Sequence, residues 1–314
     1  MRIEIPENID TFGDGATCRH TLCFIQRGLL IAQRAIKDIF HETYPIDNIT
    51  AFELGAYSKI ITNLNSFETL CLLGEDYNSC CTLARSIADS ICGLKLIYQN
   101  RDGNEIIFRH LLYILDGISE RHRLLPEQIS NNGRITEQEH TELIRQCNEA
   151  RKNCEDVIEF CHKHLALHEY ASKYPKFSKE AIKRKAWKYK CIDSSPKPKI
   201  ELYSWREMYE LLDPRDSIVS MYSSYFSQFV HGLAVSNLPC INDDDNIDSI
   251  ASVGVCLQGQ VNNRIQDLIG KDKIRSYANN EDLKYLLSLY SSDKRSKLME
   301  DAMKIISSDQ HRSV

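Results

Sequence analysis

The chain has 314 residues and a formal net charge of −5 at pH 7, with 42% hydrophobic and 26% charged residues. This balance is ordinary for a globular protein and excludes a wholly disordered chain, so we expect a packed core. There is no cationic stretch leading into an apolar run at the start and no apolar run long enough to cross a bilayer, which predicts a cytoplasmic protein without membrane contact.

Glycine and proline are few, at 13 and 8 residues, and they separate long stretches whose apolar residues recur every three or four positions. This spacing is typical of amphipathic helices. The first predicted helix runs from about Leu22 to Tyr44, where it ends because the residue before a proline disfavours helix. Further helices are predicted at about residues 51–73, 77–99 and 105–125.

A longer helix is predicted from Thr136 to about Tyr170. Its first residues, Thr-Glu-Gln-Glu, match a capping box, in which a threonine and the glutamate three positions later each bond the other's backbone N–H. After a basic segment, Asp213 is predicted as the N-cap and Pro214 as the first residue of a helix that ends near Leu233. The last predicted helices cover residues 247–269 and 281–306.

These elements predict an all-α fold, an irregular bundle of about eight to ten helices with antiparallel neighbours. The helix from Thr136 to Tyr170 would be its spine. We expect an N-terminal extension over residues 1–15, a main helical domain over residues 16–238, and C-terminal helices over residues 239–314 that pack on that domain.

Residues 173–199 form a basic segment. They contain ten Lys or Arg residues against Glu180 and Asp193, so the segment is about +8 and the rest of the chain about −13. Lysines interleaved with aromatic residues can contact phosphates and stack on bases. The predicted nucleic-acid contacts are Lys183, Arg184, Lys185, Trp187, Lys188 and Lys190. The alternative is that these cations are solvated or are paired with the acidic remainder.

Polar side chains recur on apolar faces of three predicted helices, at spacings that bring them to one side of each helix. They are Arg85 and Asp89, Arg109 and Tyr113, and Ser224, Gln228 and His231. One interpretation is a pocket for an anion or for acid–base chemistry, in which Arg85 lies within reach of His231. The alternative is a buried network that ties the helices together.

The same residues carry a resemblance. An Arg four residues before an acid, an Arg-x-x-x-Tyr helix, a Trp-containing segment and a Tyr/Ser-rich helix ending in His-Gly are similar to a family of bacterial proteins known only as a domain of unknown function. The resemblance covers roughly residues 50–238 and implies an all-helical fold without an established activity. That family would have glutamate where this chain has Asp89, so a different ion-pair geometry is expected.

Cysteine occurs twelve times, without Cys-x-x-Cys pairs. In a cytoplasmic chain this predicts reduced thiols that pack as small apolar side chains, with no disulfides. Cys147, Cys154 and Cys161 recur every seven residues, as in a helix–helix seam. Cys161 also shares a helix face with His164 and His168, a spacing suited to zinc, but no fourth ligand is nearby, so we expect no metal and no cofactor.

The sequence lacks a phosphate-binding loop, a dinucleotide fingerprint and a nucleophile elbow. Two functions are left. The first is a non-catalytic interaction or regulatory protein of the bacterial cytosol. The second is a nucleic-acid-binding module or a nuclease of a defence or toxin system, acting through residues 173–199 and the pocket of Arg85 and His231. Whether the protein is an enzyme and whether it forms a homo-oligomer stay open.

Overall fold

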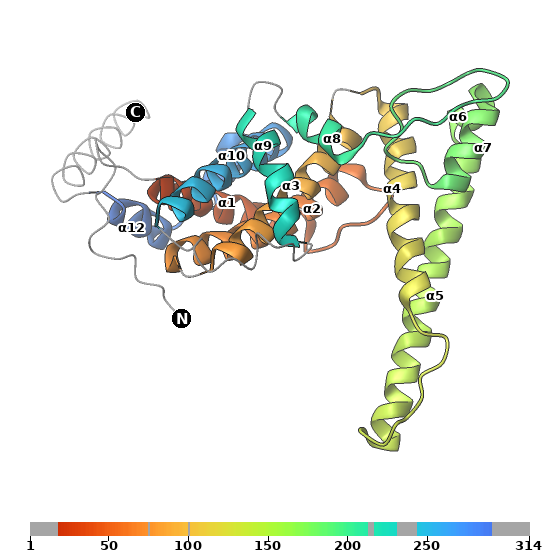
Figure 1. Ribbon diagram of the computed structural model, residues 1–314, viewed down its shortest axis with the longest axis horizontal. Coiled ribbons are helices and arrows are strands. Elements are labelled where there is room, and N and C mark those ends of the chain that lie inside the picture. The colour runs from red at the N-terminus through yellow and green to blue at the C-terminus, as the bar shows by residue number, and fades with distance from the viewer. Residues whose placement is uncertain (1–17, 75, 100, 213–216, 231–243, 291–314) are drawn as a thin grey trace, which may run out of the picture. The chain divides into compact units, whose positions relative to one another are not determined.

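The computed structural model describes residues 18–74, 76–99, 101–212, 217–230 and 244–290 (Figure 1). These residues form twelve α-helices and one isolated antiparallel bridge, so the predicted all-α fold is confirmed. Within this part of the chain, no helix combines the length and the apolar character that a membrane crossing needs. The predicted N-terminal extension lies outside the described residues.

The contacts divide the chain into two compact units, each of which is described by itself. Unit 1 comprises residues 1–93 and 209–314, and unit 2 comprises residues 94–208. The boundary that the sequence suggests at residue 238 lies outside the described residues and stays a prediction. Helix periodicity reports which face of a helix is buried, whereas the division depends on contacts between residues far apart in the chain.

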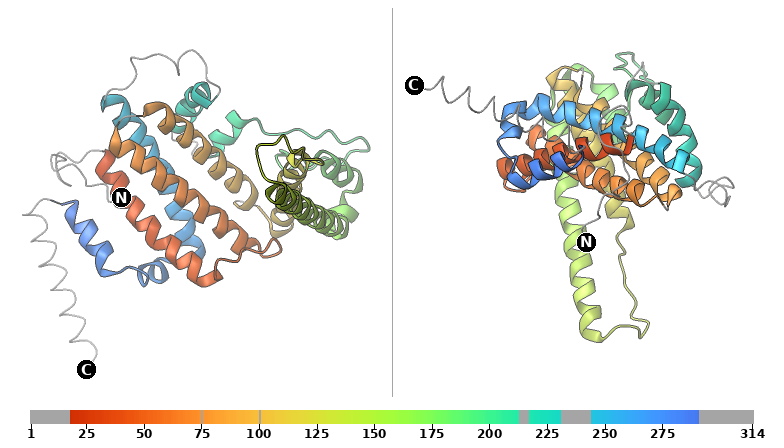
Figure 2. Two further views of the ribbon diagram at one scale, coloured as in Figure 1. Left: turned by 90° about the horizontal axis from the view of Figure 1, so that it is seen from below. Right: turned by 90° about the vertical axis from the view of Figure 1, so that its left-hand side faces the viewer.

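Three long helices, α1, α2 and α10, pack side by side in unit 1 (Figure 2). The helices assigned to this unit are α1 (Cys18–Phe40), α2 (Ile49–Leu73), α3 (Tyr77–Tyr98), whose last residues belong to unit 2, α9 (Ser217–Val230), α10 (Asp244–Ile269), α11 (Lys271–Arg275) and α12 (Asn280–Ser288). Gly254 lets α10 approach α2, because a Cβ there would lie 2.2 Å from the ring of Phe67. The close packing produces the core of the unit.

Unit 2 is built on two antiparallel helices, α4 (Gly103–Leu124) and α5 (Glu137–Leu167), followed by α6 (Glu169–Lys173) and α7 (Pro175–Arg184) (Figure 1). The predicted capping box is present: the Thr136 hydroxyl accepts the Glu139 N–H at 3.2 Å, and the Glu139 carboxylate accepts the Thr136 N–H at 2.8 Å. The helix ends at Leu167, short of the predicted Tyr170, because His168 caps both α5 and α6.

Two other predicted helix ends differ. The first helix stops at Phe40 because His41 and Glu42 adopt positive φ angles of 48° and 59°, which leave the right-handed helical region. The helix predicted from Pro214 is described as α9, while Asp213 and Pro214 lie outside the described residues. Of the last predicted helix the structure describes only α12, because residues 291–314 also lie outside the described residues.

Candidate anion-binding site

The basic segment, residues 173–199, lies within unit 2 and folds in two parts. The first part is α7. The second is a loop whose ends pair as a short ribbon: the Lys190 N–H donates to the Glu201 carbonyl at 2.8 Å, and the Tyr203 N–H donates to the Lys188 carbonyl at 2.8 Å. Tyr189 faces Leu202 in the single antiparallel bridge. Both parts therefore have defined geometry, and the cations sit on fixed backbone.

Helix α7 has one buried and one basic face. Phe177 and Ala181 are buried, whereas Lys176, Lys179 and Lys183 are exposed at positions i, i+3 and i+7. Among the described residues, no carboxylate lies within salt-bridge distance of these three ammonium groups. Within the part of the chain that the structure describes, these exposed ammonium groups therefore have no ion-pair partner.

Other cations of the basic segment do have partners inside unit 2. Lys190 pairs with Glu207, and Lys199 lies 3.1 Å from Glu201. Arg184 donates to the Ile200 carbonyl at 3.4 Å. The acidic partners, Glu201 and Glu207, follow the basic segment closely in the chain. Their ion pairs therefore neutralise more of the positive charge of the loop than of α7.

Most aromatic side chains of the basic segment are buried. Phe177, Tyr189 and Trp187 belong to the core, and Trp187 is only 8% exposed. The Trp187 indole N–H donates to the Asp116 carboxylate at 3.0 Å, and its ring meets the Tyr113 ring edge-on at 5.1 Å. Trp187, which the sequence suggested as a nucleic-acid contact, is thus part of the internal packing and does not present its ring to a base.

Arg109 explains why this loop is fixed. Its side chain is fully buried, and its three nitrogens all donate: Nε to Glu105 at 2.9 Å, Nη1 to the Trp187 carbonyl at 2.8 Å and Nη2 to the Tyr189 carbonyl at 2.8 Å. Its guanidinium carbon lies 3.6 Å from the centroid of the Tyr189 ring. Such an enclosed arginine, with each nitrogen bonded to a protein group, holds backbone in place and offers no open face to a ligand.

Arg85 and Asp89 form a separate network in unit 1. The Arg85 Nε donates to both carboxylate oxygens of Asp89, at 3.1 and 3.2 Å. The Tyr209 hydroxyl donates to the same carboxylate, and the Arg85 guanidinium carbon lies 4.9 Å from the Tyr209 ring centroid. Asp89, although shorter than the glutamate that the resemblance implies, therefore reaches Arg85. The network joins α3 to α8 (Trp205–Leu212).

The other predicted pocket residues are placed as follows. On α9, Ser224 is exposed and Gln228 is half-buried, while His231 lies outside the described residues, so its predicted approach to Arg85 stays a prediction. Arg85 and Asp89 belong to unit 1, and Arg109 and Tyr113 belong to unit 2. The described arginines thus take part in two different networks, each built from protein groups.

The cysteine and histidine residues of α5 do not form a ligand set. Cys154 and Cys161 are buried and Cys147 is half-buried, and burial raises the pKa of the Cys161 thiol to about 11. The ring of His164 stacks on Phe160 with 4.1 Å between centroids, whereas His168 packs elsewhere, against Phe108. Within the described ranges, no group of three Cys, His or carboxylate side chains could hold a metal ion.

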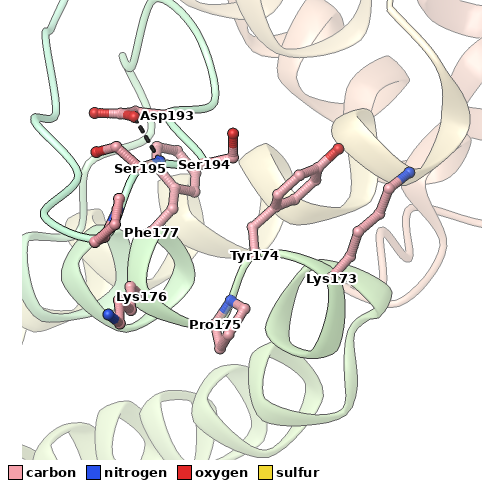
Figure 3. Close-up of a pocket in the computed structure, with 9 residues that line it drawn as sticks. Lys173, Tyr174, Pro175, Lys176, Phe177, Asp193, Ser194 and Ser195 are labelled. Atoms are coloured by element: carbon pink, nitrogen blue, oxygen red, sulfur yellow. Dashed lines mark hydrogen bonds between the residues drawn. The ribbon is translucent and has the colours of Figure 1, made fainter.

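A pocket of about 280 Å³ opens beside α7 (Figure 3). Its lining residues are Lys173, Tyr174, Pro175, Lys176, Phe177, Asp193, Ser194, Ser195 and Pro196. The Asp193 carboxylate accepts the N–H groups of Lys199 and Ser195, at 2.8 and 2.9 Å, and these bonds hold its pKa below the usual range. Asp193 therefore fixes the loop, while the lysines add positive charge to the rim.

Two aromatic residues that the sequence analysis did not single out lie beside this loop. The Lys188 ammonium is 4.9 Å from the ring centroid of Trp205, which is 37% exposed, and the Lys190 ammonium is 5.7 Å from that of Tyr203. Both rings follow the basic segment in the chain, so composition within residues 173–199 could not reveal them. Only the pairing of the ribbon brings them to these lysines.

No protein-family model, no curated protein and no solved structure matches this chain. The resemblance to an uncharacterised bacterial family accordingly stays a prediction, and function has to be argued from the geometry and charge of the site itself. In unit 2 that site is the basic segment with the exposed lysines of α7, its pocket and the two neighbouring aromatic rings.

Proposed function

We propose that this protein is a non-catalytic helical binding protein that holds an anionic macromolecule on the basic segment of unit 2. The observation that carries the proposal is the row of Lys176, Lys179 and Lys183, exposed on one face of α7 without acidic partners among the described residues. Clusters of exposed cations attract polyanions. A cytoplasmic and bacterial setting belongs to the same proposal and rests on the sequence alone.

The non-catalytic part of the proposal is supported by the state of the two arginines. The Arg109 nitrogens donate to Glu105 and to two backbone carbonyls, and Arg85 is paired with Asp89. An arginine that stabilises charge in a reaction needs donors aimed at the reacting group. Donors already bonded to the protein fit a structural role better.

The anionic macromolecule could be an acidic protein or a nucleic acid, and one observation favours nucleic acid. It is favoured by the partly exposed Trp205 next to Lys188, since cations and aromatic side chains together contact the phosphates and bases of a single strand. Neither network offers support for nuclease chemistry.

Binding of a labelled polyanion at several salt concentrations tests the proposal. We expect the affinity for oligouridine or polyglutamate to fall steeply with salt. Changing Lys176, Lys179 and Lys183 together to Gln should flatten the slope of log affinity against log salt by up to about 2 for a single strand. The matched control changes Lys59, Lys271 and Lys284, three exposed lysines of unit 1. Equal losses in both triple variants, or no binding at low salt, would contradict the proposal.

A further inference from the structure

The ribbon of unit 2 has an inward and an outward side. Trp187 and Tyr189 are buried in unit 2, whereas Lys188 and Lys190, which alternate with them in the chain, are half-buried. The ammonium groups of both lysines lie by aromatic rings of the paired segment, which places the two lysines on the outward side.

The segment paired with this ribbon adds aromatic surface to the same side. The ammonium of Lys188 lies 4.9 Å from the Trp205 ring centroid, and that of Lys190 lies 5.7 Å from the Tyr203 ring centroid. Trp205 is 37% exposed although it is one of the largest apolar side chains in the unit. Positive charge and a partly exposed aromatic residue are thus presented together, and we call Lys188, Lys190, Tyr203 and Trp205 the ribbon face.

We propose that the ribbon face is a contact site for single-stranded nucleic acid, with a phosphate on Lys188 and a base against Trp205; this rests on the proposed function. Cations track the backbone of a strand and aromatic rings stack on its bases, a combination that is tolerant of sequence. In a duplex the bases are stacked inside and their faces are not available to a protein ring. Polyglutamate would use the lysines but has no ring to stack on Trp205.

The ribbon face is held rigidly by the interior of unit 2. Arg109 bonds the carbonyls of Trp187 and Tyr189, and the Trp187 indole bonds Asp116 of α4. These contacts flank Lys188 on both sides in the chain. The loop does not have to be ordered when a ligand binds, which reduces the entropic cost of binding.

Glu207 limits the charge of the ribbon face. It pairs with Lys190 and also accepts the Ser204 N–H at 2.8 Å, and these partners lower the pKa of Glu207 to about 2. Lys188 is therefore the lysine with its charge available to phosphate. We expect Glu207→Gln to free Lys190 and tighten RNA binding several-fold, while glutamine can still accept the Ser204 N–H.

Fluorescence and affinity measured with a short oligouridine test the inference on the full chain. Trp205 and Trp187 are the two tryptophans of the protein, and Trp187 is buried, so quenching on addition of RNA should come from Trp205. Trp205→Ala should weaken oligouridine binding roughly 5- to 100-fold and abolish the quenching. Trp205→Phe should retain most of the affinity, and polyglutamate binding should be unchanged in both variants.

The outcomes separate this inference from the proposed function. If Trp205→Ala binds oligouridine as the parent does, while the Gln variant of Lys176, Lys179 and Lys183 binds it weakly, the inference is overturned and the proposed function stands. Equal affinity for duplex and single-stranded RNA would also overturn it. If neither oligouridine nor polyglutamate binds the parent protein, the proposed function itself fails. Circular dichroism of each variant verifies that its helices are intact.

Discussion

At the scale of single residues, burial decides which of the predicted groups can meet a ligand. Arg109 and Lys183 are both cations of unit 2, yet one is fully enclosed and the other exposed. The enclosed arginine is retained because carbonyls and a carboxylate replace the water it loses. The exposed lysine keeps its hydration until a partner arrives, so only the lysine is free to contribute to binding.

Removing the Arg109 side chain should therefore act on stability. In Arg109→Met, the carbonyls of Trp187 and Tyr189 lose their side-chain donor and Glu105 keeps only Arg101, at a cost of about 3–5 kcal/mol of unfolding free energy. Urea denaturation measures this cost. Arg121→Lys, an exposed position on the same helix, should change it by less than about 0.5 kcal/mol. A small effect of Arg109→Met would argue against its role in fixing the loop.

A buried carboxyl in unit 1 predicts a dependence of stability on pH. Glu68 of α2 is buried, and desolvation raises its pKa from 4.5 to about 7 despite the opposing effects of Cys23 and Arg27. The folded protein thus holds a proton that the unfolded chain releases above pH 4.5. The stabilisation of the folded state by this proton is complete below pH 4.5 and is lost as the pH rises through about 7.

Glu68→Gln tests this dependence, because glutamine keeps the shape without the titration. Between pH 5 and 8 the parent should lose roughly 2–3 kcal/mol more unfolding free energy than the variant. Urea denaturation across this range gives both curves. If they run parallel, the carboxyl is ionised in the folded state and the expected pKa is wrong.

At the scale of helices, ends are decided by capping groups and anchors. Helix α12 is held on α1 by Asp282, which is 1% exposed and pairs with Arg27 at 2.7 Å and also with Arg34. The same carboxylate accepts the Asn279 N–H at 2.9 Å as part of a capping box. One side chain thus begins the helix and attaches it to its neighbour.

Asp282→Ala should accordingly detach α12. It leaves the Arg27 and Arg34 guanidinium groups without their carboxylate, and we expect a loss of about 3 kcal/mol, the low end of the range for a buried pair because Arg34 is partly exposed. The control is Glu281→Ala, an exposed neighbour on the same helix. Faster hydrogen exchange confined to α12 should accompany the loss, and similar values for the two variants would contradict the anchoring role.

At the scale of the whole molecule, local sequence patterns predicted some features of the fold, and tertiary contacts decided others. Apolar spacing predicted the helical class and most of the long helices, and the motif at Thr136 located the start of α5. The break at His168 was missed, since a histidine that caps two helices carries no periodic signal. The two-unit division was likewise invisible to a local pattern.

The sequence by itself determined the helices and the basic segment, because side-chain periodicity and charge are properties of neighbouring residues. Tertiary structure alone decided which cations are available. It placed Trp187 and Arg109 inside unit 2 and Trp205 beside Lys188 at the surface, although the sequence had suggested Trp187 as the exposed contact. The physical reason is that burial depends on the chain folding back through the bridge of Tyr189 and Leu202, a contact that local spacing does not encode.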